Sequence, residues 1–212
     1  MNQDIASLRT DYTLKALLEE QVEKCPIDQF SVWWAEAIAS QLLEPNAFTL
    51  ATASTDGLPA ARIVLLKNVQ KDGFVFFTNY SSYKGMQLAE NPKACAVFFW
   101  KELQRQVRIT GMVKKISEAE SDEYFFSRPI ESQYGAISSP QSQVIESREW
   151  LENAYENRKN SSEKIERPSH WGGYIISPII LEFWQGRPSR LHDRLQYTLI
   201  DTGEWKIERL AP

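Results

Sequence analysis

The chain has 212 residues, 25% of them charged, and a formal net charge of −4, which is enough for one sizeable domain with its own core. The negative balance argues against a general nucleic-acid surface, which must neutralise many phosphates, while local groups of basic residues suit a small anion such as a phosphate. No apolar run reaches the roughly 20 residues of a membrane span, and the N-terminus lacks a signal-peptide pattern, so we expect a cytoplasmic protein. Cys25 and Cys95 show no metal or redox spacing, so we expect no built-in metal site.

The first 25 residues are predicted to form a polar arm with one short helix, and residues 26–212 a single domain. Four apolar residues at helical spacing indicate the short helix, and a proline would end it: Leu14, Leu17, Leu18, Val22 and Pro26. An apolar stripe predicts a second helix over residues 28–43.

From residue 47 the pattern changes to strands joined by tight turns. We expect strands over residues 47–54, 59–69, 74–78, 94–100, 104–116, 174–177, 179–184, 194–200 and 204–210. Helices are expected over residues 80–91, 118–127 and 147–164, the second of them opened by a capping box at Ser117 and Glu120. This order predicts a mainly antiparallel β-barrel with helical additions. No glycine-rich dinucleotide or P-loop motif follows a strand, which argues against those nucleotide sites.

Two stretches in this region carry candidate anion-binding residues. Within residues 62–67, the four positions between Arg62 and Lys67 are all apolar, which predicts a strand covered on both faces. Arg62 and Lys67 lie five residues apart, so a bulge or a strand end must intervene if both serve one site. In residues 80–85, which open the next helix, hydroxyls, Lys84 and free backbone N–H groups favour an anion site. The alternative is a plain serine N-cap.

A third stretch, residues 181–194, combines three arginines, a histidine and Trp184 around a Gly/Pro break. If residues 190–194 are extended, Arg190, His192 and Arg194 share one face, and Leu191 and Leu195 point into a core. Such groups repel one another unless something anionic or electron-rich lies between them. The alternative is a solvated edge strand whose charges prevent edge-to-edge pairing.

Six motifs occur together and in order, and they resemble the pyridoxine/pyridoxamine 5′-phosphate oxidase family over nearly the whole chain. They are Arg62-Ile63-Val64-Leu65-Leu66-Lys67, Gln104-Arg105-Gln106-Val107, Ser127-Arg128-Pro129, Trp171-Gly172-Gly173, the stretch from Phe183 to Arg194, and the C-terminal stretch from Trp205 to Pro212. The resemblance implies an FMN-binding split β-barrel and a homodimer with active sites at the subunit interface. It also implies FMN-dependent oxidation of pyridoxamine 5′-phosphate and pyridoxine 5′-phosphate to pyridoxal 5′-phosphate, with O2 reduced to H2O2.

The resemblance also assigns roles to individual residues. FMN contacts fall on Arg62, Ile63, Val64, Leu65, Leu66, Lys67, Phe77, Thr78, Lys84, Gln106, Gln141, Ser142, Trp184 and Arg194. Substrate contacts fall on Arg9, Tyr12, Lys67, Tyr124, Arg128, Ser132, Arg190, Leu191 and His192, with Arg9 and Tyr12 in the family's substrate-lid segment. Arg190 and His192 carry the implied catalytic role.

The chain departs from the family pattern at Tyr83, where an arginine is usual, at Phe77, where a tyrosine is frequent, and at Ile175, where an arginine is common. The first departure removes one charge next to the implied flavin phosphate. The same residues are also compatible with two other functions. One is a non-catalytic carrier of FMN or pyridoxal phosphate, and the other is a split-barrel flavin oxidoreductase that uses NAD(P)H. Flavin bleaching by NADH rather than by pyridoxamine phosphate would distinguish the latter.

Overall fold

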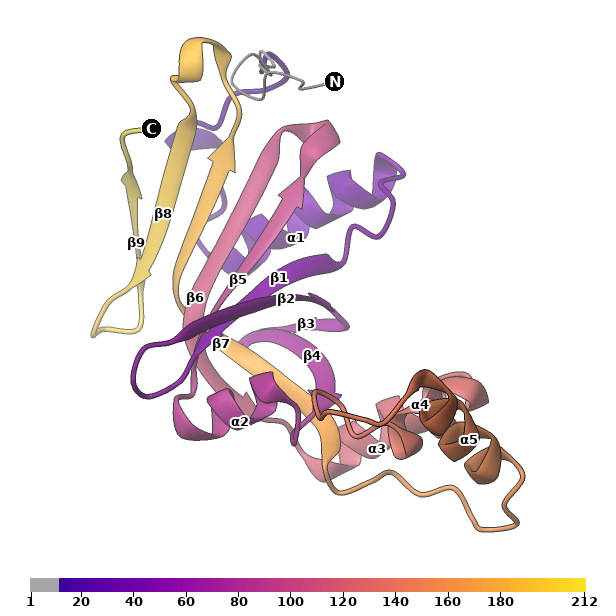
Figure 1. Ribbon diagram of the computed structural model, residues 1–212. Helices are drawn as coiled ribbons and strands as arrows, with labels where there is room; N and C mark the ends of the chain where they lie inside the picture. The colour runs from indigo at the N-terminus through magenta and orange to yellow at the C-terminus, as the bar shows by residue number, and fades with distance from the viewer. Residues whose placement is uncertain (1–11) are drawn as a thin grey trace. The chain divides into compact units, whose positions relative to one another are not determined.

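The computed structural model describes residues 12–212 (Figure 1). Its helices are α1 (Pro26–Ala39), α2 (Tyr83–Glu90), α3 (Glu118–Ser127), α4 (Ile130–Ser138) and α5 (Arg148–Lys159), with short 3-10 turns at Glu19–Gln21, Lys101–Leu103 and Pro188–Arg190. Its strands are β1 (Ala47–Ala53), β2 (Pro59–Leu65), β3 (Asn68–Gln70), β4 (Gly73–Asn79), β5 (Lys93–Trp100), β6 (Arg105–Lys115), β7 (Trp171–Gln185), β8 (Asp193–Leu199) and β9 (Trp205–Arg209).

The strands form one sheet in the order β2-β1-β5-β6-β7-β4-β3, to which β8 is added through β7 and β9 through β8. The pairings of β4 with β7, of β7 with β8 and of β8 with β9 are antiparallel. The predicted class, mainly antiparallel β with added helices, is therefore confirmed.

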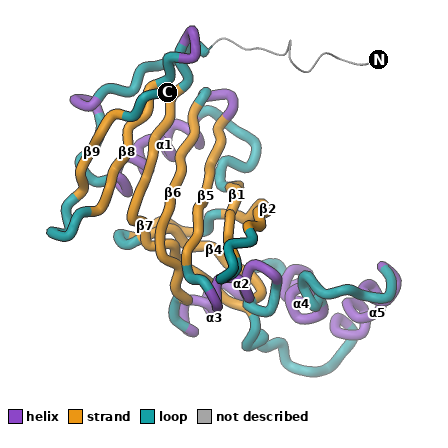
Figure 2. The backbone as a smooth tube through the Cα atoms, turned by 60° about the vertical axis from the view of Figure 1, so that its left-hand side comes forward, coloured by secondary structure: helices purple, strands orange, loops and turns teal. Residues whose placement is uncertain are grey.

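The chain divides into two compact units, and β1, β5, β6 and β7 each contribute residues to both. Unit 1 comprises the described part of Met1–Phe48 together with Ala96–Thr110 and Pro178–Pro212. Its core is aromatic: Phe30 of α1 packs edge-on against Phe98 at 5.3 Å between ring centroids, and Trp33 packs against Phe183 at 5.2 Å. Figure 2 shows β8 and β9 side by side in this unit.

Unit 2 comprises Thr49–Cys95 and Gly111–Ser177. Its core contains Phe76 against Tyr174, and the fully buried Phe125 of α3 against Trp171 at 5.3 Å. Helix α3 starts with the predicted capping box, in which Ser117 accepts from the Glu120 N–H and the Glu120 carboxylate accepts from the Ser117 N–H. Helix α5 lies against α4 (Figure 1).

Three expected elements differ in extent. Helix α1 ends at Ala39 rather than near residue 43, because Gln41 adopts a left-handed φ of 52°. The polar helix α5 ends at Lys159 rather than 164. The two strands expected over residues 174–177 and 179–184 are one strand, β7, in which Pro178 lies between the segment paired with β4 and the segment paired with β8. A proline lacks the N–H needed for a ladder bond, so this position between two partners accommodates it.

The helix predicted from the leucines at positions 14 to 18 is wrong. Only the 3-10 turn Glu19–Gln21 forms there. The backbone groups of Leu17 bond to side chains instead: its N–H donates to Asp193 Oδ2 at 3.1 Å and its carbonyl accepts from Arg209 Nη2 at 2.8 Å. Tertiary partners have therefore replaced the intrahelical bonds.

Helix α4 was not anticipated, and the strand expected over residues 59–69 is two strands, β2 and β3, separated at Leu66 and Lys67. The expected cover on both faces of residues 62–67 is also wrong, because Ile63 is 65% exposed. β2 terminates the sheet order, and its side chains alternate between exposed and half-buried up to Val64. Among residues 12–212, no helix has the length and apolar character of a membrane span.

Candidate active site

A cavity of about 760 Å³ lies within unit 2. Most of the candidate residues of that unit line it: Arg62, Ile63, Val64, Leu65, Lys67, Phe77, Thr78, Lys84, Tyr124, Arg128, Ser132 and Gln141. Two candidates do not, because Leu66 is buried in the core and Ser142 is exposed in the loop before α5 with a positive φ of 73°. Residues far apart in the sequence therefore meet around one space.

Lys84 forms one charged end of this cavity. Its side chain is almost buried, and its Nζ donates to Thr78 Oγ1 at 3.0 Å, Gln141 Oε1 at 3.0 Å and Ser82 Oγ at 3.2 Å. Ser82 is also the N-cap of α2, where it accepts from the Gly85 N–H. Burial, and then the charge of Arg62, lower the pKa of Lys84 to about 8. The serine cap, one of the two alternatives considered in the sequence, is present, and Lys84 lines the cavity.

Arg62 supplies the second cation at this end. Its Nη1 donates to Thr52 Oγ1 at 2.6 Å and to the carbonyls of Leu50 and Ala60 at 3.1 Å. Burial lowers the pKa of this guanidinium. Within residues 12–212, neither Arg62 nor Lys84 has an ion pair with a carboxylate. Two such cations lining one cavity suit a dianionic phosphate.

Three stacked rings form a flat wall of the same cavity. Phe77 stacks on Tyr124 at 3.9 Å and on Trp171 at 5.6 Å, and the planes of Tyr124 and Trp171 differ by only 7°. Lys67 lies 5.9 Å above the Tyr124 ring, so the strand end after Leu65 does bring Lys67 to the cavity that Arg62 lines. Trp171 belongs to a quoted motif, but it was not identified as a site residue.

Arg128 and Ser132 form a second charged end. The Arg128 Nη2 donates to the Ser132 carbonyl at 2.9 Å, and its guanidinium lies 4.7 Å from the Trp171 ring centre. Its Nη1 is buried and has no hydrogen-bond partner among the described residues. Burial lowers the pKa of Arg128. A buried, unused donor is costly unless a ligand satisfies it, so this end also suits an anion.

Unit 1 holds the remaining described candidates. Tyr12 packs edge-on against Trp184 at 5.7 Å and against His192 at 5.8 Å, and Trp184 lies 4.7 Å from His192. The chain passes close to Gly186, where a Cβ would lie 2.7 Å from Tyr12 Cγ. Arg9 lies outside the described residues.

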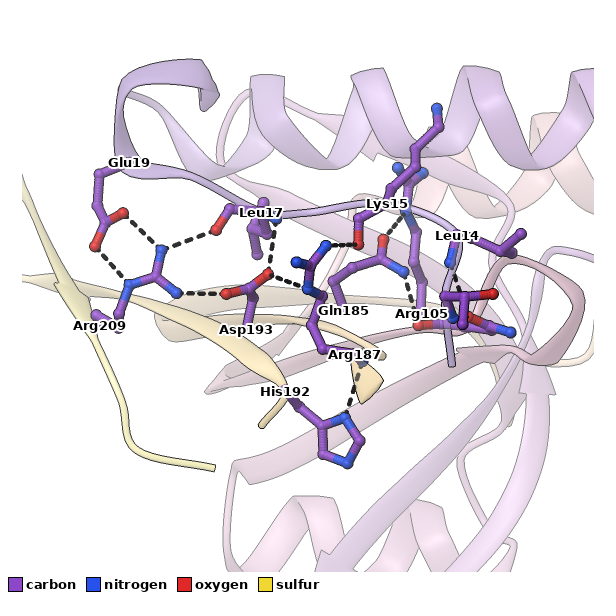
Figure 3. A network of polar contacts seen from close by, with 12 residues as sticks. Leu14, Lys15, Leu17, Glu19, Arg105, Gln185, Arg187, His192, Asp193 and Arg209 are labelled. Atoms are coloured by element: carbon purple, nitrogen blue, oxygen red, sulfur yellow. Dashed lines mark hydrogen bonds and ion pairs between the residues drawn. The ribbon is translucent and has the colours of Figure 1, made fainter. Parts of the chain in front are cut away.

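His192 has a defined hydrogen bond. Its Nδ1 accepts from the Arg187 backbone N–H at 3.1 Å, as Figure 3 shows. In the neutral imidazole the proton must then be on Nε2, which leaves Nε2 as the donor.

The extended conformation expected for residues 190–194 is wrong. Ser189 and Arg190 adopt left-handed φ values of 56° and 61° in the turn Pro188–Arg190, and β8 begins only at Asp193. Arg190 is therefore not in one strand face with His192 and Arg194, and Leu191 is 71% exposed, whereas Leu195 is buried as expected. The edge-strand alternative also fails, because β8 is paired on both sides, with β7 and β9.

Arg194 is held by an acid that the sequence analysis missed. Its Nε donates to Glu182 Oε1 at 2.8 Å, and Arg108 pairs with the other carboxylate oxygen of the same residue. Glu182 is only 2% exposed, and its hydrogen bond raises the pKa of Arg194. The available signal was a carboxylate between Leu181 and Phe183 in a buried strand, a position where an acid requires cationic partners. Gln106, in β6, is half-buried.

The described residues contain no group of three or more metal-ligating side chains. The chemistry available in unit 2 is thus cationic phosphate recognition beside a flat aromatic wall. In unit 1 it is a histidine whose Nδ1 accepts from the Arg187 N–H, beside a tyrosine and a tryptophan.

Comparisons with known proteins agree with this chemistry. A family model described as pyridoxamine 5′-phosphate oxidase matches residues 35–160, and one described as the pyridoxine 5′-phosphate oxidase C-terminal dimerisation region matches residues 171–212. Two relatives carry the name pyridoxine/pyridoxamine 5′-phosphate oxidase. The one from Trichormus variabilis is 56% identical to this chain over 100% of both chains, and the one from Salinibacter ruber is 52% identical over 98% of this chain and 99% of the relative.

Solved structures show the same fold. PhzG from Burkholderia lata, described in complex with tetrahydrophenazine-1-carboxylic acid, has a TM-score of 0.88 and 30% identity, over 94% of this chain and 100% of PhzG. A pyridoxamine 5′-phosphate oxidase-related, FMN-binding protein from Nostoc punctiforme has a TM-score of 0.72 and 19% identity, over 86% of this chain and 97% of that protein. The split-barrel fold class is confirmed, and the dimerisation match supports the expected homodimer. Both matched family models and the full-length relatives show that this chain belongs to the pyridoxine/pyridoxamine 5′-phosphate oxidase family of enzymes.

Proposed function

We propose that this enzyme oxidises pyridoxamine 5′-phosphate and pyridoxine 5′-phosphate to pyridoxal 5′-phosphate with bound FMN, and that O2 is reduced to H2O2. The observation that carries this proposal is the cavity of unit 2, whose lining includes four cations, Arg62, Lys67, Lys84 and Arg128. Cofactor and substrate each carry a phosphate, and four cations around one cavity could bind both. The full-length relatives named for this reaction support the same choice.

The residues of this chain fit FMN. Lys84 and Arg62 are cations without a carboxylate partner among residues 12–212, and Thr78 and Gln141 accept hydrogen bonds from the Lys84 ammonium. These groups would hold the cofactor phosphate. The family resemblance adds Gln106, Trp184 and Arg194 of unit 1 as flavin contacts. The bound flavin would supply the two-electron oxidation and the reaction with O2.

The protein's own part is to bind and orient the substrate. Lys67, Tyr124, Arg128 and Ser132 would hold the substrate phosphate, and the buried Nη1 of Arg128 would gain its missing partner. Arg190 and His192 would hold the pyridine ring. With Nδ1 engaged by Arg187, the Nε2 of His192 is the atom that can exchange a proton with the C4′ amine or alcohol. With the amine substrate, the oxidation would give an imine, and its hydrolysis by water would yield the aldehyde and ammonia.

The remaining expectations belong to this proposal. They are a single domain over residues 26–212, active sites at the interface of the homodimer, and a cytoplasmic location. None of them changes the chemistry assigned to the residues above.

The test is an absorbance spectrum of the purified protein followed by anaerobic addition of pyridoxamine 5′-phosphate. We expect a flavin spectrum that bleaches and then recovers in air, with formation of pyridoxal phosphate and peroxide. A flavin that does not bleach would contradict the oxidase function and support a carrier. Bleaching by NADH but not by pyridoxamine phosphate would favour a nicotinamide-dependent oxidoreductase.

A further inference from the structure

A network of polar contacts in unit 1 fastens residues 12–21, called here the N-terminal segment, to the start of β8 and the end of β9. Figure 3 shows this network, in which Arg209 lies between Glu19 and Asp193. Arg209 donates from Nε and Nη2 to the two oxygens of Glu19 at 2.8 and 2.6 Å, and from Nη1 to Asp193 Oδ1 at 2.7 Å. One guanidinium thus joins a carboxylate of the segment to a carboxylate of β8.

The same two residues also hold the segment's backbone. Arg209 Nη2 donates to the Leu17 carbonyl at 2.8 Å, and Asp193 Oδ2 accepts from the Leu17 N–H at 3.1 Å. A neighbouring guanidinium, that of Arg187, donates to the Lys15 carbonyl at 3.1 Å. Both backbone groups of Leu17 are therefore satisfied from β8 and β9, which explains why the segment is extended here rather than helical.

The segment reaches the residues assigned to the reaction through its other end. Thr13 N–H donates to Gln104 Oε1 at 3.0 Å, and the preceding Tyr12 ring packs on Trp184 and His192. Only four residues separate Tyr12 from Leu17. The clamped position of Leu17 thus restricts where the Tyr12 ring can lie.

We propose that Arg209 is a positioning residue that, together with Glu19 and Asp193, clamps the N-terminal segment and thereby holds Tyr12 against His192. Arg209 acts through the segment. The part of this inference that concerns substrate rests on the proposed function, whereas the clamp itself does not. The Arg209 hydrogen bonds lower the pKa of Glu19 to about 2, so the ion pair is formed at neutral pH.

The test combines amide hydrogen exchange with steady-state kinetics on the full-length protein. The variants are Arg209→Gln and Glu19→Gln; the second leaves the Arg209–Asp193 contact intact and covers the case in which the first fails to fold. The matched control is Lys206→Gln, which removes a charge from the same strand at a residue paired only with the exposed Glu208.

We expect exchange in peptides covering residues 12–21 to rise about threefold to tenfold in both variants, the scale of losing one or two partly exposed charge contacts. Exchange in β8 and β9, and all exchange in the control, should stay as in the wild type. The KM for pyridoxamine 5′-phosphate should rise by a similar factor, while kcat changes less than about twofold. The reason is that a Tyr12 ring already in place before substrate binds stabilises the bound substrate and the transition state equally.

Unchanged exchange in residues 12–21 would overturn the clamp. An equal rise across β8 and β9 would also overturn it, because Arg209 would then only stabilise the strands. Faster exchange with an unchanged KM would overturn the link to substrate. If the wild type fails to oxidise pyridoxamine 5′-phosphate, the proposed function fails, and the exchange data still decide the clamp.

Discussion

At Lys84 the protein keeps an ammonium group in a position that disfavours its charge. Burial and the nearby Arg62 lower its pKa to about 8, and its three hydrogen-bond acceptors are neutral. A bound phosphate would reverse this balance by favouring the charged form. The lysine therefore gives the cofactor site a pH dependence that can be measured.

We predict that the affinity for FMN is constant below about pH 8 and falls above it. There the free protein has lost the Lys84 proton and must regain it on binding, so the decline approaches tenfold per pH unit, following the pKa of about 8. Titration of flavin fluorescence between about pH 6.5 and 9.5 measures this. Lys84→Arg, which stays protonated, should bind FMN with no such decline. The same decline in that variant would show that another group is responsible.

Glu182 is the second residue with a decisive environment, because it is the buried anion shared by Arg108 and Arg194. We predict that Glu182→Gln lowers the free energy of unfolding by about 1–3 kcal/mol, since both arginines lose their counter-charge while remaining partly solvated. Chemical denaturation checks this, with Glu208→Gln on the exposed face of β9 as the control, expected to be near neutral. Equal effects of the two substitutions would contradict the structural role of Glu182.

Among the elements, helix α3 matters because it carries Tyr124 and leads directly into Arg128. Its capping box fixes the helix start. Arg167 then links the helix to Trp171, because its Nε donates to Asp122 Oδ1 of α3 at 2.6 Å and its Nη1 donates to the Trp171 carbonyl at 2.5 Å. The aromatic wall and the Arg128 end of the cavity thus depend on where α3 begins.

We predict that Ser117→Ala lowers the free energy of unfolding by about 1 kcal/mol and raises the KM for pyridoxamine 5′-phosphate. Ser147→Ala is the matched control, because Ser147 caps α5 by accepting from the Trp150 N–H at 3.0 Å, and α5 carries no candidate residue. It should cost similar stability and leave KM unchanged. A KM that rises equally in both variants would mean that the effect is a general loss of stability.

Local patterns in the sequence predicted the elements whose signals are local. The capping box of α3 and the N-cap of α2 both appear as expected. The failures lie where long-range partners decide: Leu17 bonds to Asp193 and Arg209 instead of continuing a helix, and Pro178 sits between two strand partners. Arg190 was expected in a strand, but the preceding proline and two left-handed residues form a turn there.

At the scale of the whole molecule, the candidate residues of unit 2 could be named from motif order but not placed by it. Arg62, Lys84 and Gln141 are far apart in the sequence, and only the folded chain brings them to one cavity. Trp171 and Glu182 were not predicted as site residues, because their roles depend on long-range contacts that no spacing rule encodes. Trp171 stacks with Tyr124, and Glu182 pairs with two arginines.

Because the cavity contains cations that have no anionic partner in the described part of the chain, filling it should stabilise the folded protein. We predict that FMN at about 100 times its Kd adds about 2.7 kcal/mol to the free energy of unfolding, which corresponds to about 5–10 °C in Tm for a chain of this size. Thermal unfolding of flavin-free protein with increasing FMN measures the shift. Riboflavin, which has the same ring system without the phosphate, is the matched control and should raise Tm much less at the same concentration. Equal shifts with both compounds would mean that Arg62 and Lys84 do not bind the cofactor phosphate, and the flavin would then have to be held by its ring alone.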